Sequence, residues 1–157
     1  MEKGLGLVLL ASLAAGCRNG WTVNKNSCYH VSRDTASWVE ATRMCEIHGS
    51  YLVWVESAEE QTFVQNLLQG HHHEHNYWLG GSDWTSEGTW LWEPYGKAIN
   101  YTNWLHGQPD NSHNAEHCLL LDRHSHYKWK DNDCHEAFHY ICEDSDGMKP
   151  TSSEVLG

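Results

Sequence analysis

The sequence is poor in basic residues and in the motifs of several common binding sites. Its 157 residues include 10 Lys and Arg but 21 Asp and Glu, which gives a formal net charge of −11. Proteins bind a phosphate backbone through clustered Lys and Arg. Because the basic residues here are scattered along the chain, we exclude nucleic acid as the main ligand. The chain also has no Cys-x-x-Cys pair, no EF-hand pattern and no internal repeat, which argues against a cysteine-ligated zinc site and an EF-hand.

Long apolar runs occur only at the N-terminus. Residues 4–15 are almost entirely apolar, follow a short polar start, and lead to the small residues Ala14 and Gly16. This pattern predicts a signal peptide over residues 1–16 and a secreted, extracellular protein, with acylation of Cys17 as in a bacterial lipoprotein as the alternative. No later stretch of about 20 apolar residues exists, so we expect no membrane span.

All the cysteines follow the predicted signal peptide. They are Cys17, Cys28, Cys45, Cys118, Cys134 and Cys142. An even number of cysteines in a secreted chain predicts three disulfides, but the spacing alone does not choose among the pairings.

The order of the elements predicts an α+β fold. Ser37-x-x-Glu40 and Ser57-x-x-Glu60 are both capping-box patterns, and each is followed by an apolar stripe at helical spacing. The second helix is expected to stop at Gly70. After residue 77 short runs rich in Trp and Tyr alternate with Gly, Asn, Asp and Ser, which predicts short strands and long loops. Residues 144–157 have no apolar periodicity and are expected to be a disordered tail.

Residues 17–143 resemble the C-type lectin-like domain. The resemblance rests on these segments, in this order: Cys17…Gly20-Trp21…Cys28-Tyr29, Trp38-x-x-Ala41-x-x-x-Cys45, Trp78-Leu79-Gly80-Gly81, Glu87-Gly88-x-Trp90-x-Trp92, Tyr101-Thr102-Asn103-Trp104, Gln108-Pro109-Asp110, Glu116-x-Cys118, Trp129…Cys134 and Tyr140-Ile141-Cys142-Glu143. It implies two helices with small antiparallel sheets and a long, disulfide-held loop region. It also implies the disulfides of the family's long form, Cys17–Cys28, Cys45–Cys142 and Cys118–Cys134.

The long loop is rich in the oxygen ligands that calcium prefers. Residues 108–133 contain many carboxylates and amides, and Ca²⁺ takes six to eight oxygen ligands. A solvated acidic loop is the alternative. The resemblance implies a calcium site at Gln108, Asp110, Glu116 and Asp131, which would also bind sugar hydroxyls, with a cis peptide bond at Pro109. In this family the Gln-Pro-Asp order implies galactose or N-acetylgalactosamine. His113, Tyr127 and Trp129 are candidates for stacking against the sugar ring, although the resemblance favours core packing for Trp129.

The chain departs from the family pattern at Lys130. An asparagine ligand is expected there, and lysine has no acceptor atom. Unless the loop slips so that Asn132 and Asp133 take its place, the site has one ligand fewer. The resemblance also places Asp83 and Glu87 where some members of the family have auxiliary calcium ligands, although Asn111 and His117 replace acids there.

Two histidine-containing patterns resemble metal-binding motifs, but we interpret neither of them as a functional metal site. His135-Glu136-x-x-His139 matches the zinc-protease motif, but it lies in a stretch that alternates like a strand, so we expect no enzyme. The His-rich tract at residues 71–75 is expected to be a surface loop, with adventitious metal binding as the alternative. Asn100-Tyr101-Thr102 is a glycosylation sequon, so Asn100 is the candidate glycosylation site.

Together these observations predict a calcium-dependent carbohydrate-binding protein. The resemblance implies that its partners are glycans, for example on microbial surfaces, and a role in recognition or agglutination in innate defence. No heptad repeat is present, so any homo-oligomer must form through the domain surface. The alternative is a calcium-independent lectin-like module that binds protein or mineral surfaces.

Overall fold

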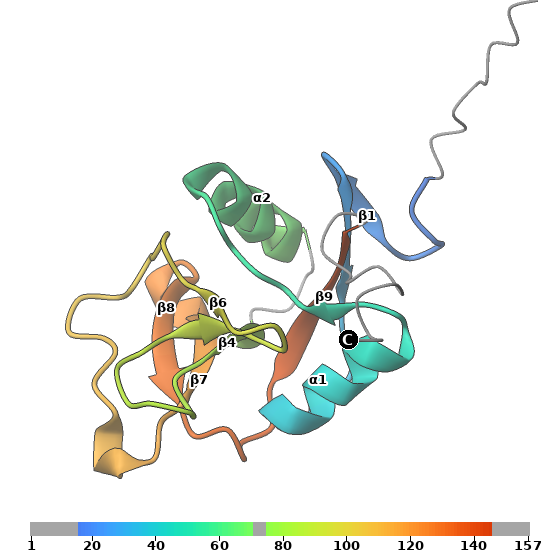
Figure 1. The fold of residues 1–157 in the computed structure, drawn as a ribbon. Helices are drawn as coiled ribbons and strands as arrows, with labels where there is room; N and C mark the ends of the chain where they lie inside the picture. The colour runs from blue at the N-terminus through green and yellow to red at the C-terminus, as the bar shows by residue number, and fades with distance from the viewer. Residues whose placement is uncertain (1–15, 71–74, 146–157) are drawn as a thin grey trace, which may run out of the picture.

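The computed structural model describes residues 16–70 and 75–145. The predicted signal peptide lies outside the described residues except for Gly16, and so do residues 71–74 of the His-rich tract and residues 146–157. Two helices and nine strands form one α+β structure, as predicted (Figure 1). No helix in the described part of the chain is long and apolar enough to cross a bilayer.

The first group of strands brings the two ends of the domain together. These strands are β1 (Thr22–Asn24), β2 (Ser27–Val31), β3 (Tyr51–Leu52) and β9 (His139–Ser145). Both β2 and β3 pair antiparallel with β9. Because Ser27 pairs with Ser145 and Cys28 with Asp144, the expected start of the tail at Asp144 is wrong: the last two residues of β9 belong to the sheet.

The second group of strands carries the long loop. These strands are β4 (Tyr77–Ser82), β5 (Leu91–Trp92), β6 (Lys97–Ala98), β7 (Cys118–Asp122) and β8 (Lys128–Asn132). Strand β7 lies between β4 and β8, antiparallel to both, and β4 pairs parallel with β9. The loop between β6 and β7, yellow to orange in Figure 1, lies on the side of the molecule away from β1.

The two helices begin at the predicted serines, but only the first has a complete capping box. In α1 (Trp38–Ile47) the Ser37 hydroxyl and the Glu40 carboxylate each accept the other residue's backbone N–H. In α2 (Ala58–Gln69) the Ser57 hydroxyl accepts the Glu60 N–H, but the Glu60 carboxylate accepts the N–H of Glu56 and the hydroxyl of Tyr29. The second predicted box is therefore half formed.

Tryptophans and disulfides hold these elements together. Trp38, Trp78, Trp92 and Trp129 are buried, while Trp90 and Trp104 pack against the core. The predicted disulfides Cys17–Cys28, Cys45–Cys142 and Cys118–Cys134 are all present. Cys45–Cys142 joins α1 to β9, and Cys118–Cys134 anchors the start of β7 beside the long loop.

A buried carboxyl group lies where α2 approaches β9. Glu143 is 5% exposed, and its carboxylate accepts the backbone N–H of Trp54. Its other oxygen lies 3.4 Å from the hydroxyl of Tyr29, which donates at the shorter distance of 2.6 Å to Glu60. Burial, together with the negative charge of the neighbouring Glu60, raises the pKa of Glu143 to about 7. Above pH 7 the folded protein must therefore hold a charge that water would solvate better.

Replacing Glu143 with glutamine should stabilise the protein at alkaline pH. The folded-state pKa lies above the unfolded one, so the cost of ionising Glu143 is complete above about pH 7 and disappears as the pH falls toward 4.5. We expect Glu143→Gln to raise the free energy of unfolding by roughly 1–3 kcal/mol at pH 8 and to have little effect near pH 4.5. Denaturant unfolding at both pH values measures this, with the exposed Glu136→Gln as the control. A destabilised variant at pH 8 would show that the hydrogen bonds outweigh the charge.

Candidate functional site

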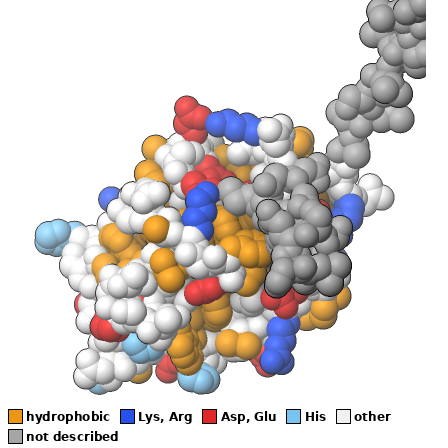
Figure 2. Space-filling view, in the orientation of Figure 1, with side chains coloured by type: hydrophobic (Ala, Val, Ile, Leu, Met, Phe, Trp, Pro, Cys, Tyr) orange, Lys and Arg blue, Asp and Glu red, His pale blue; other side chains and the backbone are white. Residues whose placement is uncertain are grey.

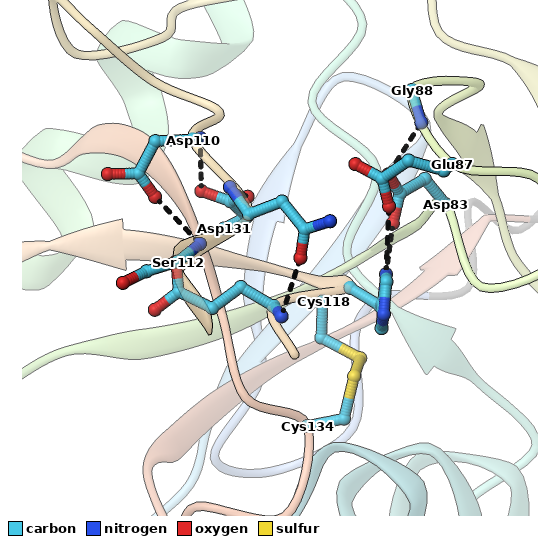
Figure 3. A network of polar contacts seen from close by, with 11 residues as sticks. Asp83, Glu87, Gly88, Asp110, Ser112, Cys118, Asp131 and Cys134 are labelled. Atoms are coloured by element: carbon cyan, nitrogen blue, oxygen red, sulfur yellow. Dashed lines mark hydrogen bonds and ion pairs between the residues drawn. A yellow bond between two sulfur atoms is a disulfide. The ribbon is translucent and has the colours of Figure 1, made fainter. Parts of the chain in front are cut away.

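Three of the predicted ligands meet where the long loop lies against β8. Asp110 and Glu116 come from the loop, and Asp131 comes from β8. One carboxylate oxygen from each lies within 4.8 Å of the others (Figure 3). The loop turns sharply between Asp110 and Glu116, where Asn111 adopts a left-handed conformation with φ 44°. The predicted cis bond at Gln108–Pro109 is present. Residues far apart in sequence are thus brought into one cluster.

Asp131 fixes the loop to the sheet. Its side chain is almost entirely buried, with the residue 2% exposed, and its two oxygens accept the backbone N–H groups of Asp110 at 3.1 Å and Asn111 at 2.7 Å. A carboxylate that accepts two backbone N–H groups is held in one orientation. Asp131 therefore sets the position of the loop as well as supplying a negative charge.

Glu116 meets the other carboxylates at an electrostatic cost. The Ser112 N–H donates to Glu116 at 3.1 Å and to Asp110 at 3.2 Å, and the Asn111 side chain accepts the Glu116 N–H. Burial raises the pKa of Glu116, and the hydrogen bond with Asp110 and the charges of Asp131 and Asp110 raise it further. Within the described residues no Lys or Arg forms an ion pair with any of the three carboxylates. A bound cation would relieve this repulsion.

The fourth predicted ligand, Gln108, has an amide oxygen without a partner. Its Oε1 is inaccessible to solvent and accepts no hydrogen bond from the described residues. Buried polar atoms are nearly always satisfied, so this atom is suited to a ligand or ion that the chain itself does not provide. The three converging carboxylates are hard oxygen donors of the kind that Ca²⁺ prefers, and Gln108, two residues before Asp110, would add an amide oxygen.

Lys130 does not contribute to this cluster. Its Nζ lies 3.8 Å from Oδ1 of Asp122, the carboxylate at the end of β7. The loop does not slip to compensate, because Asp131 pairs with Leu119 and Asn132 with Cys118 in a regular ladder. The Asn132 side chain accepts the N–H of Asp133. Asn132 and Asp133 therefore do not move into the position of the missing amide ligand.

Two of the three proposed stacking residues are inaccessible. Tyr127 is 6% exposed, so the prediction that it could contact a sugar is wrong, whereas Trp129 is fully buried in the core, which confirms the packing role favoured for it. The reason is that Trp129 packs edge-on against three other aromatic rings, those of Trp92, Tyr101 and Trp104. His113 is exposed, and its Nδ1 lies 3.1 Å from the Ser112 hydroxyl. His113 remains the aromatic residue available beside the cluster.

The His135-Glu136-x-x-His139 segment lacks the helix that a zinc protease requires. Its first four residues lie in a turn and bridge region, and His139 begins β9. His135 is exposed and pairs with Asp133, whereas His139 stacks on His75 with ring centroids 4.1 Å apart. The two imidazoles are therefore engaged with different partners.

A second cluster of ligating side chains forms beside the first. Asp83, Glu87 and His117 bring two carboxylate oxygens and an imidazole nitrogen within 4.8 Å of one another (Figure 3). The sequence pattern indicates Asp83 and Glu87 as metal ligands, but it shows His117 only as a residue that replaces an acidic ligand. His117 directly follows Glu116, and the side chains of these two consecutive residues point to different clusters. This adjacency is the sequence signal that could have indicated His117.

The fold, its disulfides and its acidic loop define a lectin-type binding domain. Residues 34–144 match the model of the Lectin C-type domain. The chain is 41% identical over 129 residues to perlucin from Haliotis laevigata, covering 82% of this chain and 83% of perlucin. It is 33% identical over 116 residues to the galactose-specific lectin nattectin from Thalassophryne nattereri, covering 73% and 72% of the two chains. The chain belongs to the C-type lectin domain family.

A solved structure supports the same assignment. The C-type lectin CEL-I from Cucumaria echinata superposes with a TM-score of 0.76 and 30% sequence identity, covering 81% of this chain and 96% of CEL-I. The matched family is a lectin domain, that is, a binding domain.

Proposed function

We propose that this protein binds calcium through Gln108, Asp110, Glu116 and Asp131 and uses the same residues to bind terminal sugars. The observation that supports the proposal most strongly is the convergence of three carboxylates that no basic side chain of the described residues neutralises. The unpartnered Oε1 of Gln108 adds a neutral oxygen donor nearby in the sequence.

The residues of the site would have distinct roles in this binding. Calcium, when bound, supplies a positive centre that attracts sugar hydroxyl oxygens. Asp110 and Glu116 would accept hydrogen bonds from those hydroxyls, and the Gln108 amide can both donate and accept. Asp131 would bind the ion and position the loop rather than contact the sugar, because its oxygens already accept backbone N–H groups of the loop.

A galactose or N-acetylgalactosamine preference is the specificity we propose. The order Gln108-Pro109-Asp110 supports it, and a relative that is 33% identical is named a galactose-specific lectin. A single shallow sugar site binds weakly, so useful affinity needs several linked copies. We therefore include homo-oligomerisation through the domain surface, secretion, and recognition or agglutination of microbial glycans in the proposal.

The surface charge agrees with a glycan rather than a nucleic acid as partner. On the face shown in Figure 2 the Lys and Arg side chains are dispersed and form no continuous basic patch. The side chain of Asn100 is exposed, so the proposed glycan at this sequon would project into solvent.

Lys130 favours the second candidate function, a calcium-independent module that contacts protein or mineral surfaces, because its position supplies no calcium ligand.

A glycan array probed with and without a calcium chelator tests the proposed function. We expect binding to galactose- and N-acetylgalactosamine-terminated glycans in calcium, and loss of the signal when the chelator is added. An array read with mannose-terminated glycans in parallel controls for non-specific adhesion. Absent binding, or binding that the chelator does not change, would instead support the calcium-independent module.

A further inference from the structure

A surface hollow lies between the start of α1 and the strands β4 and β5. Its volume is about 260 Å³, and most of the side chains that line it are apolar. The lining includes the buried Trp38 and the exposed Val39, Trp84 and Pro94. None of the lining residues is a proposed calcium ligand, so the hollow is distinct from the carboxylate cluster at Asp110.

Trp84 presents a large aromatic surface at this hollow. All nine tryptophans lie within the described residues, and among them only Trp84 is exposed, at 55%. Its ring contacts the imidazoles of His117 and His135, with centroid separations of 5.9 and 6.3 Å. The Nδ1 of His117 lies in turn 3.1 Å from Oδ1 of the buried Asp83. The indole is therefore supported from within the fold while much of its surface meets water, which an apolar ligand face would displace favourably.

A nearly buried hydroxyl group lines the same hollow. Ser82 ends β4 and is 3% exposed, and its hydroxyl forms no hydrogen bond with any of the described residues. Buried polar groups are nearly always hydrogen-bonded, so this hydroxyl is suited to a polar group that enters the hollow from outside.

Two further polar side chains belong to the lining. The Thr42 hydroxyl donates to the carbonyl of Trp38 at 3.0 Å, which leaves its oxygen able to accept a hydrogen bond. Glu93 is half-buried and adds a carboxylate. Its backbone is fixed, because its N–H donates to Gly80 and its carbonyl accepts the indole N–H of Trp54. The hollow thus combines an apolar lining with a few polar groups, the usual composition of a small-molecule site.

We propose that this hollow is a second sugar-binding site, which holds one pyranose ring without calcium. A pyranose ring has an apolar face of C–H groups and an edge of hydroxyls. The face can cover the Trp84 indole while the hydroxyls bond to Ser82 and Glu93. A purely apolar occupant, such as the hydrophobic surface of a second copy of the chain, fits worse, because it would bury both of these polar groups without partners.

Saturation-transfer NMR in a calcium chelator tests the proposal, with galactose, glucose, mannose and N-acetylglucosamine as separate probes. We expect at least one of the four sugars to show saturation of its ring C–H protons. Trp84→Ala should weaken this binding at least about fivefold, through loss of the stacking surface. Tyr95→Ala is the matched control and should keep it, because Tyr95 is an aromatic residue of similar exposure, 46%, next to Pro94 but outside the lining.

A second variant separates binding from folding. Ser82→Ala should weaken sugar binding by about two- to tenfold, the loss of one hydrogen bond. It should leave the midpoint of thermal unfolding unchanged, because the hydroxyl has no partner among the described residues. Since every measurement is made in chelator, failure of the proposed calcium site would not alter these results.

Three outcomes would overturn the proposal. They are no saturation of any of the four sugars by the wild type, unchanged binding in Trp84→Ala, and an equal loss in Tyr95→Ala. A dimer on gel filtration that Trp84→Ala dissociates, without a sugar signal, would assign the hollow to contact between copies of the chain instead.

Discussion

Replacing Asp131 with asparagine is expected to abolish retention of the protein on galactose resin. Asp131 supplies a buried negative charge to the proposed calcium site and also accepts two backbone N–H groups of the long loop. Asparagine has the same shape, but it removes the charge and one of its two terminal groups cannot accept a hydrogen bond. Loss of even an indirect partner of a metal ligand costs about 10–100-fold in affinity, and we expect at least that loss for calcium here.

Asp122→Asn is the matched control for this experiment. Asp122 is a buried aspartate on the neighbouring strand, and its side chain pairs with Lys130. This variant should keep its calcium and sugar binding. Equal retention of Asp131→Asn and the wild type on galactose resin would contradict the assigned role, as would equal losses in the two variants.

Removing the Cys45–Cys142 disulfide is expected to cause the largest loss of stability. This bond links residues 97 positions apart, and closing a loop of about 100 residues stabilises the folded chain by about 4–5 kcal/mol in the chain-entropy model. Both cysteines are buried in the core beside Trp38 and Trp78, so alanine at these positions also leaves unfilled space. Denaturant unfolding of the Cys45→Ala/Cys142→Ala variant measures the loss.

The Cys17–Cys28 disulfide provides the comparison. It links residues only 11 positions apart, so the same model gives it about 3 kcal/mol. The variant lacking Cys17 and Cys28 should therefore remain folded under conditions in which the variant lacking Cys45 and Cys142 is largely unfolded. If the short-loop variant lost as much stability as the long-loop variant, loop length would not be the source of the difference.

Local signals in the sequence predict much of the fold. The helix starts follow from Ser37 and Ser57, because the hydroxyl of each accepts the first free backbone N–H groups of its helix. The capping partner of Ser57 could not be predicted, because the Glu60 carboxylate is engaged by Tyr29 and Glu56. The end of β9 also depends on distant residues, since Asp144 and Ser145 are ordered by pairing with β2.

The candidate site was predictable only in part, because the directions of some of its side chains also depend on residues that are distant in sequence. The resemblance indicates Asp110, Glu116 and Asp131, and the structure brings these three together. The direction of Lys130 depends on Asp122, which lies on a neighbouring strand, so the sequence alone leaves open whether lysine enters the site. The orientation of His117 toward two acids likewise follows from the pairing of β4 with β7, not from a local pattern.

Calcium-dependent sugar recognition is tested most directly by calorimetric titration of calcium into metal-free wild-type protein, with and without galactose. We predict saturable binding at or below millimolar calcium, the range of extracellular calcium sites. Because sugar binding is proposed to need the ion, galactose should tighten calcium binding by the same factor by which calcium tightens sugar binding. The absence of heat at millimolar calcium, or a calcium affinity that galactose leaves unchanged, would contradict the proposed mechanism.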